Sequence, residues 1–251
     1  MPFEIRDNDN RVFPPNIHPE AEAIIVLRGE LSMSINHVAM TLTAGDIAFI
    51  FPNIVHSYLA GCQNRSTCLL FSPYFAGEYA KTLNAMAPVN PVMQLKSLHR
   101  DVPGILRTLH DKDLDDKLLR AYLTLLTGHL LKPLELTASA KSDDKGIIEN
   151  ISTYIGSHFR DPLSLDDVAA ALGVSKYCVS RYFSQRLKCG FSAYVNTLRA
   201  HYAEHMLTSK PDLSITDVCY ESGFDSLSTF YRSFRQSFGE SPGKFRGRAS
   251  R

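Results

Sequence analysis

Apolar and polar positions follow two different patterns along the chain. Between residues 23 and 72 the apolar residues form short runs that end at turn residues, which is typical of short strands. The runs predict strands at 23–35, 41–43, 47–51, 56–60 and 67–72, with a turn at Arg28 and Gly29 that divides the first range into two strands. Several short strands with frequent turns favour a small β-barrel or jelly roll.

Helical spacing begins after Ser72 and predicts helices at 75–86, 102–109 and 116–131. The last of these carries a broad apolar stripe, formed by Leu118, Leu119, Tyr122, Leu125, Leu126, His129 and Leu130. A stripe this wide suits a helix that packs on its own barrel and on a second subunit, and burial within one subunit explains it equally well. The polar residues 135–146 predict a linker.

The rest of the chain contains one pattern twice, at residues 164–183 and 214–234. Each copy has a Ser, an Asp three residues later and then a Gly, namely Ser164, Asp167 and Gly173, and Ser214, Asp217 and Gly223. Ser and Asp at this spacing resemble a capping box, and Gly suits the end of a helix. Each copy therefore predicts two short helices with a turn between them.

The second helix of each copy has one apolar and one polar face. The apolar faces carry Val179, Tyr182 and Phe183 in the first copy and Phe230, Phe234 and Phe238 in the second. The outward faces carry Lys176, Tyr177, Ser180, Arg181, Ser184 and Gln185, and Leu227, Ser228, Tyr231, Arg232 and Arg235. Arg, hydroxyl and aromatic groups at helical spacing suit the DNA major groove, where Arg can bind guanine with two hydrogen bonds. Two ordinary solvated faces are the alternative, which the repetition disfavours.

Within these outward faces the residue types predict different roles. We expect Tyr177, Ser180 and Arg181 to contact bases in a first groove segment. In the second segment we expect base contacts from Leu227, Ser228, Tyr231 and Arg232. Lys176, Gln185 and Arg235 are better suited to phosphates or groove edges.

The region from 147 to 246 also resembles a known family. The residues concerned are Arg199, Ala203, Leu207, Leu213–Ile215, Gly223, Phe224, Phe238, Gly239, Ser241, Pro242, Phe245 and Arg246. In this spacing they resemble the signature of AraC/XylS-type transcription regulators. The resemblance implies seven helices in two helix-turn-helix units, joined by a long helix at about 193–207. It also implies that both recognition helices enter successive major-groove segments of promoter DNA.

The β-rich part resembles the cupin sensor domain often found ahead of this module. The matching residues are Asn16, His18, Glu22 and Gly29, then Gly45, Asp46, Pro52 and His56. In metal cupins such positions supply three His and a Glu, and here Asn16 replaces the first His. His18, Glu22 and His56 thus remain as candidate ligands of a divalent metal. The alternative is a polar effector pocket formed by Asn16, His18, Glu22 and His56. Sensor domains of this family commonly dimerise through their helices.

Composition narrows the class of protein. The 251 residues are 44% hydrophobic and 21% charged, as in soluble globular proteins. No apolar run is long enough to span a bilayer, the N-terminus has no signal-peptide character, and five cysteines without a framework spacing suggest a reducing cytoplasm. Residues 1–146 carry 14 Lys and Arg against 16 Asp and Glu, whereas residues 147–251 carry 13 against 10. The C-terminal half is therefore mildly basic, which agrees with DNA binding.

Together these observations predict an α+β protein with four segments. These are a cupin-like effector domain at 1–82, a helical and dimerisation segment at 83–134, a linker at 135–146 and a DNA-binding domain at 147–251. The predicted function is a cytoplasmic transcription regulator or activator that binds a small molecule, such as a sugar, and acts on RNA polymerase. No membrane partner and no obligatory cofactor are expected. A metal-dependent cupin enzyme, a dioxygenase or isomerase with a DNA-binding tail, is the alternative, disfavoured by Asn16.

Overall fold

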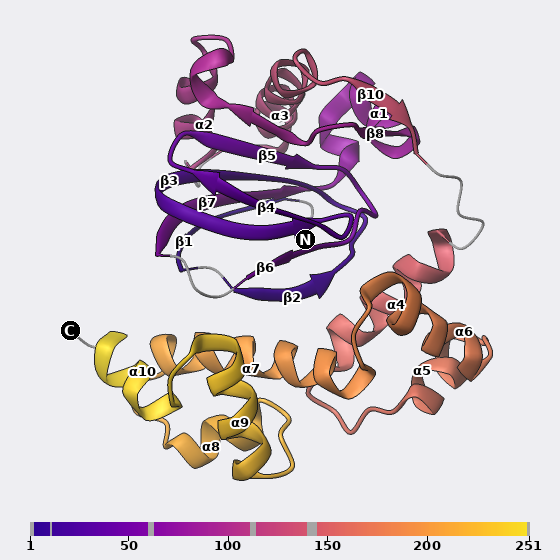
Figure 1. Cartoon of the computed structure of the whole chain (residues 1–251), viewed down its shortest axis with the longest axis vertical. Coiled ribbons are helices and arrows are strands. Elements are labelled where there is room, and N and C mark those ends of the chain that lie inside the picture. Colours follow the sequence, from indigo (N-terminus) through magenta and orange to yellow (C-terminus); the bar gives the residue numbers. More distant parts are fainter. Residues whose placement is uncertain (1–2, 11, 60–62, 111–113, 140–144, 250–251) are drawn as a thin grey trace. The chain divides into compact units, whose positions relative to one another are not determined.

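The computed structural model describes residues 3–10, 12–59, 63–110, 114–139 and 145–249, and it divides into two compact units (Figure 1). The first unit comprises residues 1–11 and 17–143, and the second comprises 12–16 and 144–251. Strands dominate the first unit and helices the second, so the predicted α+β class is confirmed. No helix among the described residues is long and apolar enough to cross a membrane.

The strands of the first unit pair in antiparallel fashion. They are β1 (Phe3–Asp9), β3 (Ala21–Ile35), β4 (Val38–Thr43), β5 (Asp46–Ile50), β6 (His56–Tyr58), β7 (Asn64–Phe71) and β9 (Val92–Gln94). Their order is β1-β7-β3-β5-β9, with β4 and β6 paired to the second half of β3. A separate pair is formed by β8 (Met86–Pro88) and β10 (Leu136–Ala138). The short strand β2 (Phe13–Asn16) groups with the second unit.

β3 is a single strand of 15 residues where the sequence predicted two, so the turn at Arg28 and Gly29 was wrong. The pairing with β7 shifts register between Val26 and Arg28, and Gly29 has a φ of 74°. A glycine in this conformation permits a bulge that bends a strand without ending it. β3 therefore pairs with β5 and β7 before the bulge and with β4 and β6 after it.

Helices cover one face of this sheet (Figure 1). They are the 3₁₀ helix η1 (Pro73–Tyr79), α1 (Ala80–Ala85), the 3₁₀ helix η2 (Leu95–Ser97), α2 (Val102–Leu109) and α3 (Asp116–Leu131). The alternate residues Ala21, Ala23 and Ile25 of β3 pack with Leu123 and Leu126 of α3 in the buried core. Fully burying one such Leu stabilises the fold by about 1.5–3 kcal/mol.

Two of the three helices predicted for the first unit have the expected bounds, while the third helix and the predicted linker differ. The predicted ranges 102–109 and 116–131 are confirmed. The range 75–86 is divided into η1 and α1, because Gly77 has a φ of 59° that no α-helix accommodates. Part of the predicted linker is the strand β10, which pairs with β8, and residues 140–144 lie outside the described part.

The described part of the second unit contains the seven α-helices that the family resemblance implied. They are α4 (Lys145–His158), α5 (Leu165–Leu172), α6 (Lys176–Arg181), α7 (Phe191–Ser209), α8 (Ile215–Glu221), α9 (Leu227–Phe238) and α10 (Pro242–Ala249). The first copy of the repeat forms α5 and α6, and the second forms α8 and α9. A π-helical turn, η3 (Tyr182–Leu187), follows α6 and has no counterpart after α9.

Both predicted capping boxes are present. The N–H of Asp167 donates to Ser164 Oγ at 3.2 Å, and the Ser164 N–H donates to Asp167 Oδ2 at 2.8 Å. Ser214 and Asp217 make the same pair of bonds at 3.0 and 3.3 Å. The hydrogen bonds from the Ser164 O–H and N–H lower the pKa of Asp167. The carboxylate therefore stabilises α5 at neutral pH, and this contribution is lost as the pH falls through its lowered pKa.

Gly173 and Gly223 occupy equivalent positions in the two copies and provide a matched test of packing. Both have positive φ, at 65° and 88°, but a Cβ on Gly173 meets nothing within 4 Å. A Cβ on Gly223 would lie 2.5 Å from the backbone oxygen of Arg160.

Gly173→Ala should lower the free energy of unfolding by about 1 kcal/mol, because alanine is strained in the left-handed conformation. Gly223→Ala should cost about 3 kcal/mol, because backbone must also move. Urea unfolding followed by circular dichroism measures both, and equal losses would contradict the close contact at Gly223.

Candidate functional site

The outward faces of α6 and α9 are exposed, as the sequence predicted. The exposed predicted DNA contacts are Lys176, Tyr177, Ser180, Arg181, Gln185, Leu227, Ser228, Tyr231, Arg232 and Arg235. Tyr177 is 72% exposed and Tyr231 is 38% exposed, although aromatic side chains usually bury more of their surface. The opposite faces are buried through Val179 and Phe183 in the first copy and Phe230 in the second. Each helix thus presents one polar and aromatic face to solvent.

Two contacts order the outward face of the first copy. Arg181 Nε donates to Gln185 Oε1 at 3.0 Å, which fixes the direction of the guanidinium group. Lys176 Nζ lies 2.7 Å from Asp166 Oδ2, in an exposed ion pair that contributes little to stability. A recess of about 110 Å³ between α4 and α6 is bordered by Tyr177, Arg181 and Gln185. The side chains of these three residues are therefore accessible from the recess.

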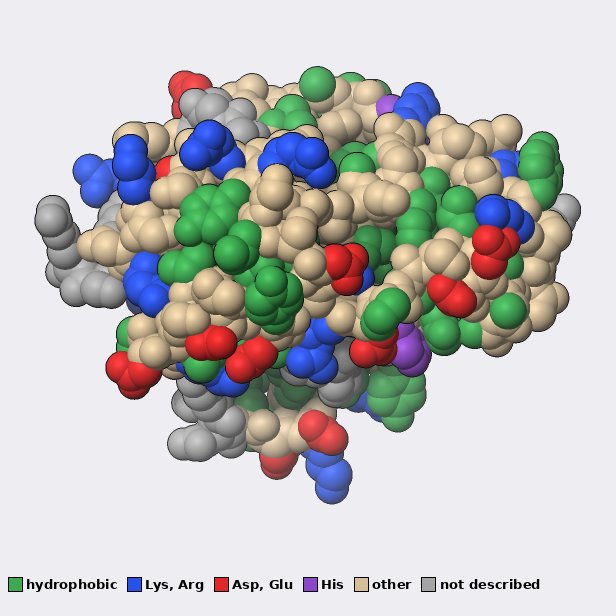
Figure 2. Space-filling model, turned by 90° about the horizontal axis from the view of Figure 1, so that it is seen from below, with side chains coloured by type: hydrophobic (Ala, Val, Ile, Leu, Met, Phe, Trp, Pro, Cys, Tyr) green, Lys and Arg blue, Asp and Glu red, His purple; other side chains and the backbone are tan. Residues whose placement is uncertain are grey.

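The charge of the molecule's surface is mixed. Figure 2 shows Lys and Arg side chains among hydrophobic ones on one face, with acidic side chains between them. This face therefore has no continuous basic surface of the kind that gives strong binding to DNA of any sequence.

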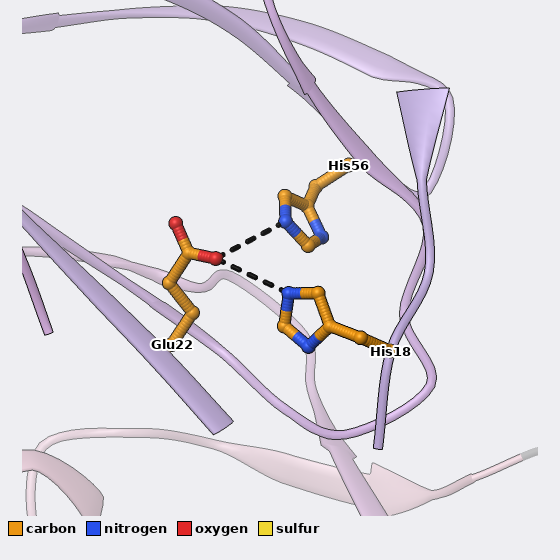
Figure 3. Close-up of side chains that lie close together, drawn as sticks. All are labelled: His18, Glu22 and His56. Atoms are coloured by element: carbon orange, nitrogen blue, oxygen red, sulfur yellow. Dashed lines mark hydrogen bonds and ion pairs between the residues drawn. The ribbon is translucent and has the colours of Figure 1, made fainter. Parts of the chain in front are cut away.

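A second group of interest lies in the first unit, where the structure brings together His18, Glu22 and His56 (Figure 3). Glu22 Oε2 lies 3.2 Å from His18 Nε2 and 3.3 Å from His56 Nε2. Glu22 and His56 are buried and His18 is partly buried. Glu22 lies on β3 and His56 on β6, while His18 precedes β3, so three separate positions of the chain converge on one oxygen. We call these three residues the sensor cluster.

The other carboxylate oxygen of Glu22 is also occupied. The Tyr58 hydroxyl and the Cys68 thiol both donate to Glu22 Oε1, the thiol at 3.1 Å. The sequence prediction did not include these two residues. Tyr58 was within reach of prediction, because it lies two residues after His56 and alternate residues of a strand share a face. Cys68 needed the pairing of β7 with β3, which the sequence does not give.

The remaining ring nitrogens of the sensor cluster contact backbone carbonyls. His18 Nδ1 lies 3.2 Å from the oxygen of Glu20, and His56 Nδ1 lies 3.0 Å from the oxygen of Ile54. Because a carbonyl only accepts, both Nδ1 atoms must carry a hydrogen for these bonds to form. In a neutral ring the Nε2 atom is then an acceptor, and two such atoms face a carboxylate oxygen. A proton shared across these contacts or a bound cation would satisfy this geometry.

Asn16, the fourth residue predicted for the effector pocket, ends β2. Its Oδ1 accepts a hydrogen bond from the Tyr194 hydroxyl of α7 at 3.0 Å, within the second unit. Its predicted place in the effector pocket rested on the spacing of a cupin motif. That spacing does not show which way an individual side chain turns.

Comparison with known families decides the class of protein. Residues 3–128 match the AraC-like ligand binding domain, and residues 168–248 match a helix-turn-helix domain. The chain belongs to the AraC family of transcription regulators. In this AraC-type regulator the sensor cluster lies inside the ligand-binding match, and α6 and α9 lie inside the helix-turn-helix match.

Two relatives illustrate the match. An uncharacterized HTH-type transcriptional regulator of Staphylococcus aureus is 34% identical over 190 residues, which are 76% of this chain and 24% of the relative. The chain therefore spans about a quarter of that protein's length. The Msm operon regulatory protein of Streptococcus mutans is 23% identical over 243 residues, covering 93% of this chain and 86% of that protein.

Solved structures of ToxT from Vibrio cholerae have a similar fold. One has a TM-score of 0.66 and 14% identity, with 98% of both chains covered. Another, with an unsaturated fatty acid bound, has a TM-score of 0.63 and 16% identity, with 97% of this chain and 94% of that chain covered. The AraC-type regulator and ToxT therefore share a fold.

Tyr58→Phe tests the buried hydrogen bonds of the sensor cluster. The change removes one of the two donors to Glu22 Oε1 and leaves the ring in place. A buried acceptor that loses a donor costs about 1–3 kcal/mol, so the free energy of unfolding should fall by that amount. Tyr74→Phe is the matched control, because Tyr74 is 67% exposed. Chemical denaturation of both variants measures the difference; an unaltered Tyr58→Phe protein would mean that Tyr58 does not support Glu22.

Proposed function

We propose that this AraC-type regulator reads two successive major-groove segments of promoter DNA, one with α6 and one with α9. The exposed outward faces of both helices carry this proposal. α7 connects the two copies without a break and is about 28 Å long, from its 19 residues and a rise of about 1.5 Å per residue. That length is comparable to one turn of DNA, about 34 Å.

The exposed side chains of the two helices divide into those that contact bases and those that contact phosphates or groove edges. Tyr177, Ser180 and Arg181 contact bases in the first segment, and Arg181 uses its nitrogens beyond Nε, which is held by Gln185. In the second segment Leu227, Ser228, Tyr231 and Arg232 contact bases. Lys176, Gln185 and Arg235 contact phosphates or groove edges. The DNA-bound protein acts in the cytoplasm on RNA polymerase.

The sensor cluster is proposed to bind the effector, a neutral polyhydroxy molecule such as a sugar. Hydroxyl groups can donate both to the Glu22 carboxylate and to the imidazole Nε2 atoms, so they match the acceptors that the cluster presents. A fatty acid, as in one ToxT structure, would bring a second carboxylate close to Glu22. Like charges at that distance repel, which favours the neutral ligand.

A divalent transition metal is a second candidate occupant of the sensor cluster. Two imidazole nitrogens and a carboxylate oxygen converge, and each ring is oriented through its Nδ1 by a backbone carbonyl. Orientation of ligating His rings through the second nitrogen is typical of metal sites. A metal ion would supply a positive centre for the three acceptors.

α3 is proposed as the contact with a second subunit. Leu118 and Leu125 are 50% and 49% exposed, whereas Leu119 and Leu126 are buried against the sheet. The broad stripe predicted from the sequence is thus buried on one side only. Leu118 and Leu125 lie seven residues apart and so face the same direction on a helix.

Replacement of the two recognition arginines tests the reading of DNA. Arg181→Ala and Arg232→Ala should each lose about 1–3 kcal/mol of binding free energy at one base pair and relax the preference there. Gel shifts with single-base operator variants measure this, and Arg65→Ala in the first unit is the control. A loss that is uniform across all variants would instead assign these arginines to phosphates.

Replacement of His56 tests the effector site. His56→Ala should abolish the change in operator affinity that a bound sugar produces, while affinity without the sugar stays within about twofold, because His56 lies outside the helix-turn-helix match. A panel of neutral sugars, screened by thermal shift on the full chain, identifies the ligand first. The metal content of the purified protein separates the two candidate occupants. A full sugar response in His56→Ala would exclude the sensor cluster as the effector site.

A further inference from the structure

A second group of metal-ligating side chains lies on the surface of the first unit, away from the residues assigned above. His99, Asp101 and His129 each offer one ligand atom, and these atoms lie within 4.8 Å of one another. His99 and Asp101 belong to the segment between η2 and α2, and His129 lies in the last turn of α3. Segments about 30 residues apart in sequence therefore meet at this point. We call the three residues the surface triad.

The Asp101 carboxylate does not cap the helix that follows it. Asp101 is the N-cap residue of α2, but its side chain makes no capping hydrogen bond, and Pro103 in the first turn has no N–H to offer. Asp115, in the same position before α3, accepts hydrogen bonds from the N–H groups of Lys117 and Leu118 at 2.9 and 2.8 Å. Asp101 Oδ2 lies instead 3.3 Å from His99 Nδ1.

His99 Nδ1 faces this carboxylate and also lies 3.4 Å from the backbone nitrogen of Asp101. Either a proton on Nδ1 or a bound cation satisfies the 3.3 Å contact between this nitrogen and the carboxylate oxygen. Metal bonds of about 2.0–2.2 Å at a tetrahedral angle place two ligand atoms roughly 3.3–3.5 Å apart, which is the spacing found here.

His129 supplies the third ligand. Its ring stacks on that of His99 with centroids 4.9 Å apart and planes at 8°. Its ligand nitrogen lies within 4.8 Å of the other two ligand atoms, and a rotation of the side chain would turn it toward a shared metal ion. The backbone on both sides is held firmly, since Val102 after Asp101 and Leu130 after His129 are 0% and 1% exposed in the common core. A site built on such rigid elements needs little rearrangement to bind.

We propose that the surface triad binds a divalent transition metal such as Zn²⁺, through His99, Asp101 and His129, with water completing the coordination. Two imidazoles and one carboxylate suit zinc, nickel or copper and do not suit the all-oxygen preference of calcium or magnesium. Arg100 competes only weakly for the carboxylate, because its Nε is 4.0 Å from Asp101 Oδ1 on a side chain that is 92% exposed. The bound metal would tie the end of α3 to the segment before α2. This proposal does not depend on DNA reading or on the effector.

Titration calorimetry of the full chain with Zn²⁺ tests the proposal. His129→Ala and His99→Ala should each weaken one zinc-binding event at least about tenfold, a loss comparable to that of an orienting residue at known sites. His129→Gln keeps much of the side-chain volume and should show the same loss. His110→Ala is the matched control, because His110 is also exposed and lies outside the triad.

The outcomes separate the two candidate metal sites of this chain. His18→Ala affects a zinc event in the sensor cluster and should leave the event at the surface triad unchanged. Co²⁺ absorption bands lost in His129→Ala but kept in His18→Ala would support the triad. Zinc affinity and stoichiometry that are the same in the wild-type protein and in all three triad variants, with circular dichroism showing folded protein, would overturn the proposal.

Discussion

One buried arginine in α7, the helix between the two copies of the repeat, holds the end of α4 in place. Arg199 lies in the middle of α7, 7% exposed, and donates to the backbone oxygens of Phe159 and Asp161 at 2.6 and 2.8 Å. Burial lowers its pKa, while Asp225 and Asp161 oppose this change. Removing a buried charged donor leaves carbonyls without partners, so this contact fixes the end of α4 against α7.

On either side of Arg199, α7 packs against both copies of the repeat. Tyr194, toward its start, contacts the ring of Phe183 after α6, with centroids 5.5 Å apart. Ala203 and Met206, toward its end, belong to the core that buries Phe230 and Phe234 of α9. A helix is a stiff connector, so the two outward faces keep a constant separation whatever occupies the ligand-binding unit.

The ligand-binding unit is organised around a buried carboxylate. Glu22 is 2% exposed on a strand whose neighbouring alternate residues are apolar, and its oxygens are met by His18, His56, Tyr58 and Cys68. Burying a charge is costly unless partners replace the lost water. The stability of the first unit therefore depends on the groups that make hydrogen bonds to Glu22. A bound ligand or cation that contacts Glu22 would contribute in the same way. The proposed binding site and a structural requirement thus coincide in one residue.

The sequence by itself determined the elements whose causes are local. Ser164 and Asp167, with their counterparts Ser214 and Asp217, specify helix starts through bonds between residues three apart, and periodic apolar positions specify α2, α3 and the buried faces of α6 and α9. Tertiary structure decided what depends on partners distant in sequence. The bulge at Gly29, the strand β10 and the meeting of His99 with His129 all require another segment to be in place. The orientation of the Asn16 side chain likewise depends on its hydrogen bond with Tyr194. Local spacing in the sequence cannot predict a bond to a residue so far along the chain.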